Sequence, residues 1–297
     1  MTEARNLISV VIPAYNRADK IEASIKSVQA QTYKDWEIVV SDDGSKDSTK
    51  EVVERLIKSD KRIRLVSRET NAGAQAARNA GIKAAQGEWI AFLDSDDQFL
   101  PESLELRMNI ALKEHVDVVH SDAFIQHQGK PLEQYHVPAW KGNIYRKILV
   151  KEGPMFPALL IKKSALERIG YLDENIRSYQ EWDTCIRLAK HYEFGFEPQP
   201  TFVYDYRTSN AISRDFIRAG IGYEQSLAKH WKDMLLYNGT GALAYHYDVA
   251  AQWYQKGNDL VNYKRCASRA GLFKVLSPIR ILRKIKHVIF RNGKNNG

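Results

Sequence analysis

The sequence predicts an α/β fold with a mostly parallel central sheet, followed by a helical C-terminal region. Five short apolar segments rich in β-branched residues recur along the chain, and each has the composition of a buried strand. They comprise residues 8–12, 36–41, 63–66, 89–93 and 116–119. Segments with helical spacing of apolar residues separate them. Strand alternating with helix is typical of a parallel sheet that is covered by helices on both faces.

The predicted helices between the strands carry their apolar residues three or four positions apart. These positions are Ile21, Ile25 and Val28, then Val52, Val53, Leu56 and Ile57, then Ala76, Ala77, Ala80 and Ala84. After residue 210 the pattern becomes helical and rich in tyrosine and tryptophan, which we interpret as packing residues of a helical core. We therefore predict a domain boundary between residues 213 and 214.

The positive charge of the chain is concentrated near its C-terminal end. The formal net charge is +8, but residues 264–297 contain ten Lys or Arg and no Asp or Glu, so the rest is slightly acidic. This distribution argues against a nucleic-acid-binding protein. The two cysteines, Cys185 and Cys266, lie too far apart in sequence to indicate a disulfide framework or a zinc site. We expect a cytoplasmic protein without a signal peptide or a membrane-spanning segment.

Acidic residues follow two of the predicted strands. Asp42 and Asp43 end the second strand, and a run from Asp94 to Asp97 follows the fourth. Ligands of parallel sheets bind beyond the carboxyl ends of the strands, so these residues are expected to share a site. Because residues i and i+2 of an extended chain point the same way, Asp94 and Asp96 can both supply oxygen ligands to Mg²⁺ or Mn²⁺ carrying a diphosphate. Turn formation and helix capping are alternative roles for such residues.

Four motifs in this order resemble those of the large inverting family of GT-A-fold glycosyltransferases. They are Val-Ile-Pro-Ala-Tyr-Asn at 11–16, Val-Ser-Asp-Asp-Gly-Ser-Lys-Asp-Ser-Thr at 40–49, Asn71-x-Gly73 with Ala-Arg-Asn at 77–79, and Phe-Leu-Asp-Ser-Asp-Asp at 92–97 with Pro101. The resemblance covers about residues 7 to 210. It implies a GT-A catalytic domain at 1–213, with a nucleotide-sugar half at about 1–97 and an acceptor half at about 98–213, and a helical region at 214–297.

The resemblance implies a role for each matching residue. Residues 13–15 match the segment that lines the base and ribose pocket, and Asp42 matches the aspartate that reads the uracil edge. Asp94 matches a ribose or metal contact and Asp96 the direct metal ligand. Arg78 matches a nucleotide contact, with an exposed helix arginine as the alternative. The nucleotide-binding residues implied in this way are Pro13, Ala14, Tyr15, Asp42, Asp43, Arg78, Asp94, Ser95 and Arg207.

Residues 179–188 resemble the family's acidic motif, which opens a helix and whose first Asp usually serves as the catalytic base. Inverting transfer needs such a base to deprotonate the acceptor hydroxyl. This chain has Glu181 at that position and Asp183 two residues later, so Glu181 is the candidate base and Asp183 the alternative. Acids in a first helical turn are also favoured by the helix dipole without any chemistry.

Residues 203–213 resemble the family's Tyr-Arg-x-His-x-x-Ser segment, a loop that closes over the donor phosphates. The histidine is missing, which leaves the third protein ligand of the metal unassigned. Arg207 is either a diphosphate contact or an ion-pair partner of Asp205.

Together these features predict an inverting glycosyltransferase that uses a nucleotide diphosphate sugar, with UDP as the expected nucleotide and Mn²⁺ or Mg²⁺ as the metal. The expected acceptor is a saccharide, in particular a lipid-linked one of surface-glycan synthesis. A sugar nucleotidyltransferase is the first alternative, but residues 13–17 lack its glycine-rich triphosphate loop. A catalytically inactive, membrane-associated binding protein is the second.

The C-terminal tail has the pattern of a basic amphipathic helix. Ser277 and Pro278 are a typical helix start, and an apolar stripe follows. The stripe consists of Ile281, Leu282, Ile285, Val288 and Ile289, while Arg280, Arg283, Lys284, Lys286 and Arg291 lie largely off it. Such a helix suits an anionic membrane surface, and packing on the rest of the protein is the alternative. We therefore expect an enzyme held peripherally at the inner face of the cell membrane.

Overall fold

The computed structural model describes residues 6–206 and 215–276, and the chain divides into two compact units. The first, which we call the α/β unit, comprises Met1–Tyr145, Gly153–Asn175 and Gln180–Asn210. The second, the helical unit, comprises Arg146–Glu152, Ile176–Tyr179 and Ala211–Gly297. The helical unit thus includes two short segments from the middle of the chain, which a single boundary after residue 213 does not anticipate.

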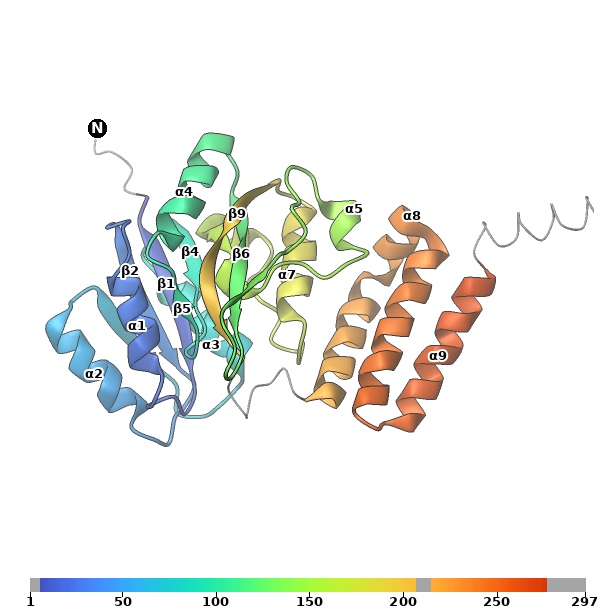
Figure 1. The fold of residues 1–297 in the computed structure, drawn as a ribbon, viewed down its shortest axis with the longest axis horizontal. Coiled ribbons are helices and arrows are strands. Elements are labelled where there is room, and N and C mark those ends of the chain that lie inside the picture. The colour runs from blue at the N-terminus through green and yellow to red at the C-terminus, as the bar shows by residue number, and fades with distance from the viewer. Residues whose placement is uncertain (1–5, 207–214, 277–297) are drawn as a thin grey trace, which may run out of the picture. The chain divides into compact units, whose positions relative to one another are not determined.

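The α/β unit contains a sheet with the strand order β3-β2-β1-β4-β8-β6-β9-β5, and β7 pairs with β6 (Figure 1). The strands are β1 Ile8–Ala14, β2 Trp36–Asp42, β3 Ile63–Ser67, β4 Trp89–Phe92, β5 Gln98–Phe99, β6 Val118–Gln126, β7 Glu133–Tyr135, β8 Leu160–Lys162 and β9 Phe194–Asp205. Strands β1 to β4 pair in parallel, and β8 pairs antiparallel with both β4 and β6. The predicted α/β class is confirmed, and the antiparallel strands belong to the second half of the sheet.

Alternate residues of β1 pack against helices on opposite faces of the sheet. Val10 and Ile12 belong to one buried core cluster with Ile25 of α1. On the other face, Gly81 of α3 approaches Val11 so closely that a Cβ atom at position 81 would lie 2.5 Å from Val11 Cγ1. Successive side chains of a strand point to opposite faces, so β1 is buried on both sides, as its continuous apolar sequence predicts.

The helices of the α/β unit follow the predicted alternation through α3. They are α1 Ile21–Gln29, α2 Thr49–Ser59, α3 Ala74–Ala84, α4 Ser103–Glu114, a 3-10 turn at Phe156–Ala158, α6 Lys163–Arg168 and α7 Gln180–Ala189, with α5 Tyr145–Ile148 at the junction with the helical unit. Arg107 of α4 is fully buried and donates hydrogen bonds to the carbonyl oxygens of Pro157 and Leu159. This contact holds the 3-10 turn against α4.

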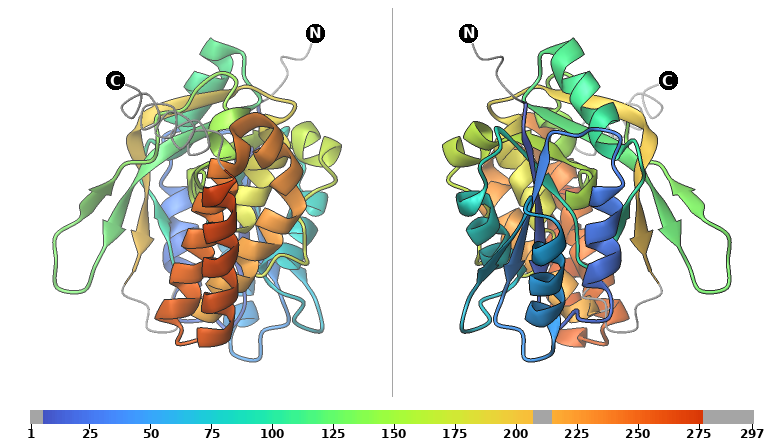
Figure 2. Two further views of the ribbon diagram at one scale, coloured as in Figure 1. Left: turned by 90° about the vertical axis from the view of Figure 1, so that its right-hand side faces the viewer. Right: turned by 90° about the vertical axis from the view of Figure 1, so that its left-hand side faces the viewer.

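The helical unit is built from α8 Phe216–Lys256 and α9 Leu260–Val275, which lie side by side (Figures 1 and 2). Gly239, with φ 74°, breaks α8 into two helices. Tyr223 and Tyr254 are buried as predicted for core residues, but the aromatic side chains of Trp231, Tyr237 and Tyr245 are exposed, which corrects that prediction for them. In the described ranges, no helix combines the length and apolarity needed to cross a membrane.

Candidate active site

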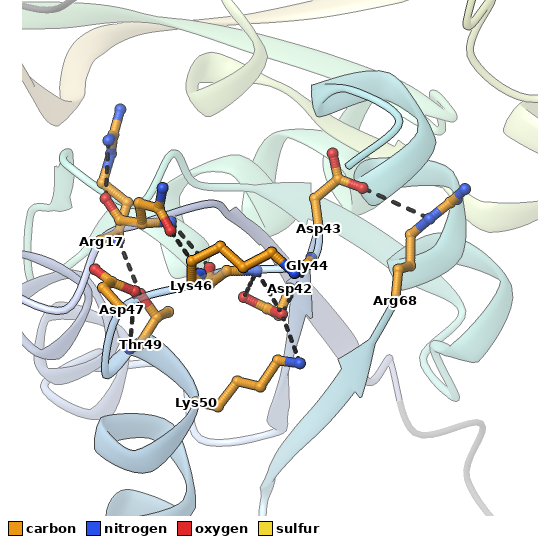
Figure 3. A network of polar contacts seen from close by, with 11 residues as sticks. Arg17, Asp42, Asp43, Gly44, Lys46, Asp47, Thr49, Lys50 and Arg68 are labelled. Carbon is orange, nitrogen blue, oxygen red and sulfur yellow. Dashed lines mark hydrogen bonds and ion pairs between the residues drawn. The ribbon is translucent and has the colours of Figure 1, made fainter. Parts of the chain in front are cut away.

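Asp42 closes the turn that follows β2. Its buried carboxylate accepts hydrogen bonds from the backbone N–H groups of Gly44 and Ser45, both at 3.2 Å, and Lys50 Nζ lies 3.5 Å away (Figure 3). Gly44 has φ 77°, a left-handed conformation that favours glycine. Asp42 therefore stabilises the turn after β2, which is the structural role that the sequence left as an alternative to nucleotide binding. Its contact with a uracil remains a prediction.

Asp43 connects the end of β2 to the loop that leads into α3. Its carboxylate accepts hydrogen bonds from the N–H groups of Ala72 at 3.1 Å and Gly73 at 2.7 Å. Arg68 Nε lies 3.5 Å from the same carboxylate (Figure 3). Asp43 thus fixes the position of the loop that precedes Arg78, and it supports the predicted nucleotide site through the backbone of that loop.

The loop after β1 is hydrogen-bonded to the loop after β2. Asn16, with φ 52°, donates its N–H to Ser45 Oγ at 2.9 Å and accepts the N–H of Lys46 on its side chain at 2.8 Å. The N–H of Arg17 donates to Thr49 Oγ1 at 2.8 Å (Figure 3). The carboxyl ends of these two parallel strands therefore form one continuous rim of loops.

The predicted pocket residues of β1 differ in exposure. Pro13 and Ala14 are buried within the strand, whereas Tyr15 at its end is 42% exposed. Tyr15 is therefore the one of the three whose side chain is available to a ligand. Pro13 and Ala14 contribute through the shape of the backbone.

Arg78 holds Asp94 in place. The Arg78 side chain is buried, and Nη2 donates to Asp94 Oδ1 at 2.5 Å while Nη1 donates to Gln75 Oε1 at 2.8 Å. The guanidinium carbon also lies 4.6 Å from the centre of the Phe156 ring. This burial rules out the alternative of an exposed helix arginine. Arg78 is instead the counter-charge of a predicted metal-binding carboxylate.

Asp96 and Asp97 differ in their surroundings. Burial raises the pKa of Asp96, and the neighbouring Asp94 carboxylate adds to this, while Arg17 Nη2 lies 3.9 Å from Asp96 Oδ2. Asp97 is buried, accepts the backbone N–H of Asp205 at 2.9 Å, and has its pKa raised by burial and by Asp94. Ser95 is also buried, as expected for the residue that faces away from the two flanking carboxylates.

The Asp94 and Asp96 carboxylates fit a divalent cation. Their side chains are 30% and 21% exposed, and both offer the oxygen ligands that Mg²⁺ and Mn²⁺ prefer. The raised pKa of Asp96 reflects buried negative charge that a dication would neutralise. Across residues 6–206 and 215–276, no three His, Cys, Asp or Glu side chains gather as a metal site. The third protein ligand therefore stays unassigned.

The two candidate bases of α7 occupy different environments. Asp183 is fully buried and accepts a hydrogen bond from Arg187 Nε at 2.8 Å. Arg187 in turn donates to the carbonyl oxygens of Ile169 at 2.8 Å and Tyr171 at 2.6 Å, so Asp183 helps to hold the preceding loop on α7. Glu181 lies in the first turn of the same helix and is partly exposed. The geometry favours Glu181 over Asp183 as a group that can reach a substrate.

Arg17 is the residue near the site that the sequence prediction missed. Its position directly after the Pro-Ala-Tyr-Asn motif was the available signal, because that motif ends a strand on the ligand side of the sheet. Two predictions fall outside the described residues, namely Arg207 and the amphipathic tail at 277–297.

The fold and the family match together identify a GT-A glycosyltransferase. The chain belongs to the family described as Glycosyl transferase family 2, which matches residues 9–170. A glucosyltransferase of Escherichia coli, named for UDP-Glc and α-D-GlcNAc-diphosphoundecaprenol, is 34% identical over 181 residues, covering 61% of this chain and 70% of its own length. Three rickettsial glycosyltransferases are 35 to 36% identical, but the chain spans only about a third of their length or less.

Solved structures share the fold at low sequence identity. Staphylococcus aureus TarS 1–349 in complex with UDP-GlcNAc has a TM-score of 0.61 and 18% identity, covering 88% of this chain and 90% of that one. A mannosyltransferase of Pyrobaculum calidifontis in complex with GDP-Man and Mn²⁺ has a TM-score of 0.59 and 18% identity, covering 93% and 82%. These likenesses establish the GT-A architecture.

Proposed function

We propose that this glycosyltransferase moves a sugar from a UDP-sugar to a lipid-linked saccharide with inversion, assisted by Mn²⁺ or Mg²⁺. The observation that carries the proposal is the pair of carboxylates after β4: Arg78 holds Asp94, and Asp96 lies 3.9 Å from Arg17 of the loop after β1. The UDP and UDP-GlcNAc complexes of TarS and the lipid-linked acceptor in the name of the Escherichia coli relative support the choice of donor and acceptor.

The reaction is an in-line displacement at the anomeric carbon. The acceptor oxygen forms a bond to that carbon, the bond to the diphosphate oxygen breaks, and the acceptor proton passes to the Glu181 carboxylate. Glu181 lies in the first turn of α7, where the helix dipole favours its ionised, proton-accepting form. A cation held by Asp94 and Asp96 would neutralise the charge of the departing diphosphate.

The proposed location is the inner face of the cell membrane, where a lipid-linked acceptor would be presented. Support comes from the composition of residues 277–297, which combine basic and apolar residues without an acidic one. The tail would place the enzyme at the surface that holds its acceptor.

The test is a panel of UDP-, GDP- and dTDP-sugars, assayed for nucleoside diphosphate release with Mn²⁺ or Mg²⁺. We expect UDP release with one UDP-sugar, loss of transfer in Glu181→Gln by at least roughly a hundredfold, and UDP affinity close to that of the wild type. Glu167→Gln, at an exposed position on α6, is the matched control and should retain full activity.

Three outcomes would contradict the proposal. Diphosphate release from UTP and a sugar phosphate would indicate a nucleotidyltransferase, and no turnover of any donor would indicate a binding protein. Full transfer by Glu181→Gln would reject the assignment of the base.

A further inference from the structure

A four-residue segment, Ile176–Tyr179, belongs to the helical unit and leads directly into α7 of the α/β unit. We call it the strap. Its main chain is hydrogen-bonded to α8 at Arg177. The N–H of Arg177 donates to Gln225 Oε1 at 3.0 Å, and its carbonyl oxygen accepts from Arg218 Nε at 2.9 Å. Both backbone polar groups of this strap residue are therefore fixed by α8 side chains.

Gly222 of α8 lies directly against the next strap residue. A Cβ atom at position 222 would lie 2.5 Å from the carbonyl oxygen of Ser178 and 2.7 Å from its Cα atom, closer than real Cβ contacts. The obstruction is main chain, so it cannot be relieved by rotating a side chain. Glycine at this position allows the backbones of helix and strap to touch.

Tyr179, the last strap residue, has φ 58°, a left-handed conformation that is uncommon for an aromatic residue. Its ring packs edge-on against Tyr223 with centroids 4.9 Å apart, and the Trp253 ring centroid lies 6.2 Å away. A strained backbone conformation persists only where the surroundings enforce it. Here the surroundings are α8, and the residue they constrain stands two positions before Glu181.

We propose that α8 positions the catalytic base through the strap, with Gly222 as the positioning residue. The proposal rests on the proposed function, because it requires Glu181 to be the base. The Gly222 backbone sets where the strap lies, and the left-handed Tyr179 sets the direction in which the chain enters the first turn of α7. None of the predicted donor-binding residues belongs to the strap, so the proposal concerns the base and not the donor site.

The decisive experiment compares Gly222→Ala with Gly241→Ala in the full-length protein. Gly241 lies in the same α8, and a Cβ atom there meets nothing within 4 Å. Misplacing a catalytic group by about 1 Å can cost roughly a hundredfold in rate. We expect Gly222→Ala to lower kcat by about ten- to a hundredfold while KM for the UDP-sugar and the Kd of UDP stay within about twofold. Gly241→Ala should leave all three unchanged.

Gly222→Ala could unfold the helical unit, and a thermal melt would reveal this. A second variant is then used. Arg218→Met removes the side-chain hydrogen bond to the strap carbonyl and should lower kcat several-fold without weakening UDP binding. Equal losses of kcat and UDP affinity, or unchanged kcat in both variants while Glu181→Gln is inactive, would overturn the positioning role. Absence of turnover by the wild type would instead overturn the proposed function itself.

Discussion

At the scale of single residues, the site depends on an ion pair between a buried arginine and a partly exposed aspartate. Arg78 Nη2 lies 2.5 Å from Asp94 Oδ1, and the Arg78 guanidinium also contacts the Gln75 side chain and the Phe156 ring. Removing one member of a buried pair leaves the other without compensation, which typically costs about 3 to 5 kcal/mol. Asp94 is partly exposed, so water offsets part of this cost.

Arg78→Met should therefore lower the free energy of unfolding by about 2 kcal/mol and weaken Mn²⁺-dependent UDP binding by at least about tenfold. Urea denaturation and calorimetric titration of UDP with Mn²⁺ measure the two effects. Arg55→Met is the control, because Arg55 makes only an exposed ion pair with Glu22, so this variant should unfold at nearly the same urea concentration as the wild type. Wild-type UDP binding by Arg78→Met would show that Asp94 does not need its partner.

Some features of the site follow from local sequence and others from tertiary contacts. Acidic residues after strands were predictable, because strand ends and turn-forming residues are local features. The resemblance placed Glu181 ahead of Asp183 as the base, but the ion pair that buries Asp183 was not predictable. It depends on Arg187, whose guanidinium also binds the loop at 169–171.

At the scale of elements, the tail at 277–297 is the segment that we expect to bind the membrane. The segment lies outside the described residues, so its amphipathic pattern is the basis of the proposal. Basic residues near an anionic membrane contribute about 1 kcal/mol each, and an apolar stripe adds burial below the headgroups.

We expect full-length protein to float with vesicles that contain anionic lipid, and protein truncated after residue 276 to remain in solution. Replacing Arg280, Arg283, Lys284 and Lys286 by glutamine should weaken flotation while leaving the apolar stripe intact. Neutral vesicles are the control surface. Equal flotation of the truncated and full-length proteins would reject a membrane role for the tail.

At the scale of the whole molecule, each unit contains a buried neutral histidine. Burial lowers the pKa of His120 in β6 and of His246 in α8 to about 4. His246 is hydrogen-bonded to Tyr223 Oη and to the Leu149 carbonyl oxygen, both at 2.8 Å. The folded state therefore resists protonation that the unfolded chain accepts near pH 6.5.

The direction in which stability changes with pH follows from the difference between the folded and unfolded pKa of these histidines. Stability from these histidines is complete above pH 6.5, falls as the pH drops toward 4, and falls no further below the folded pKa. At pH 5 each histidine should cost about 2 kcal/mol relative to pH 7.5. Asp96 and Asp97 act in the opposite direction because their pKa values are raised, so the wild type must be compared with a variant that lacks one histidine.

The comparison uses His246→Gln, which removes one titrating group. Urea denaturation at pH 7.5 and 5.0 should show a smaller loss of stability on acidification for this variant than for the wild type. An identical pH dependence of the two proteins would mean that His246 is not protonated preferentially in the unfolded state.

The sequence by itself determined the order of strands and helices through α3, the acidic strand ends and the helical C-terminal region. These features follow from the spacing of apolar residues and from turn chemistry, both of which act over a few neighbouring positions. Only the tertiary structure decided which charges pair and which main chains touch, such as Arg78 with Asp94 and Gly222 with Ser178. Packing joins residues that are distant in sequence, and no local pattern specifies those contacts.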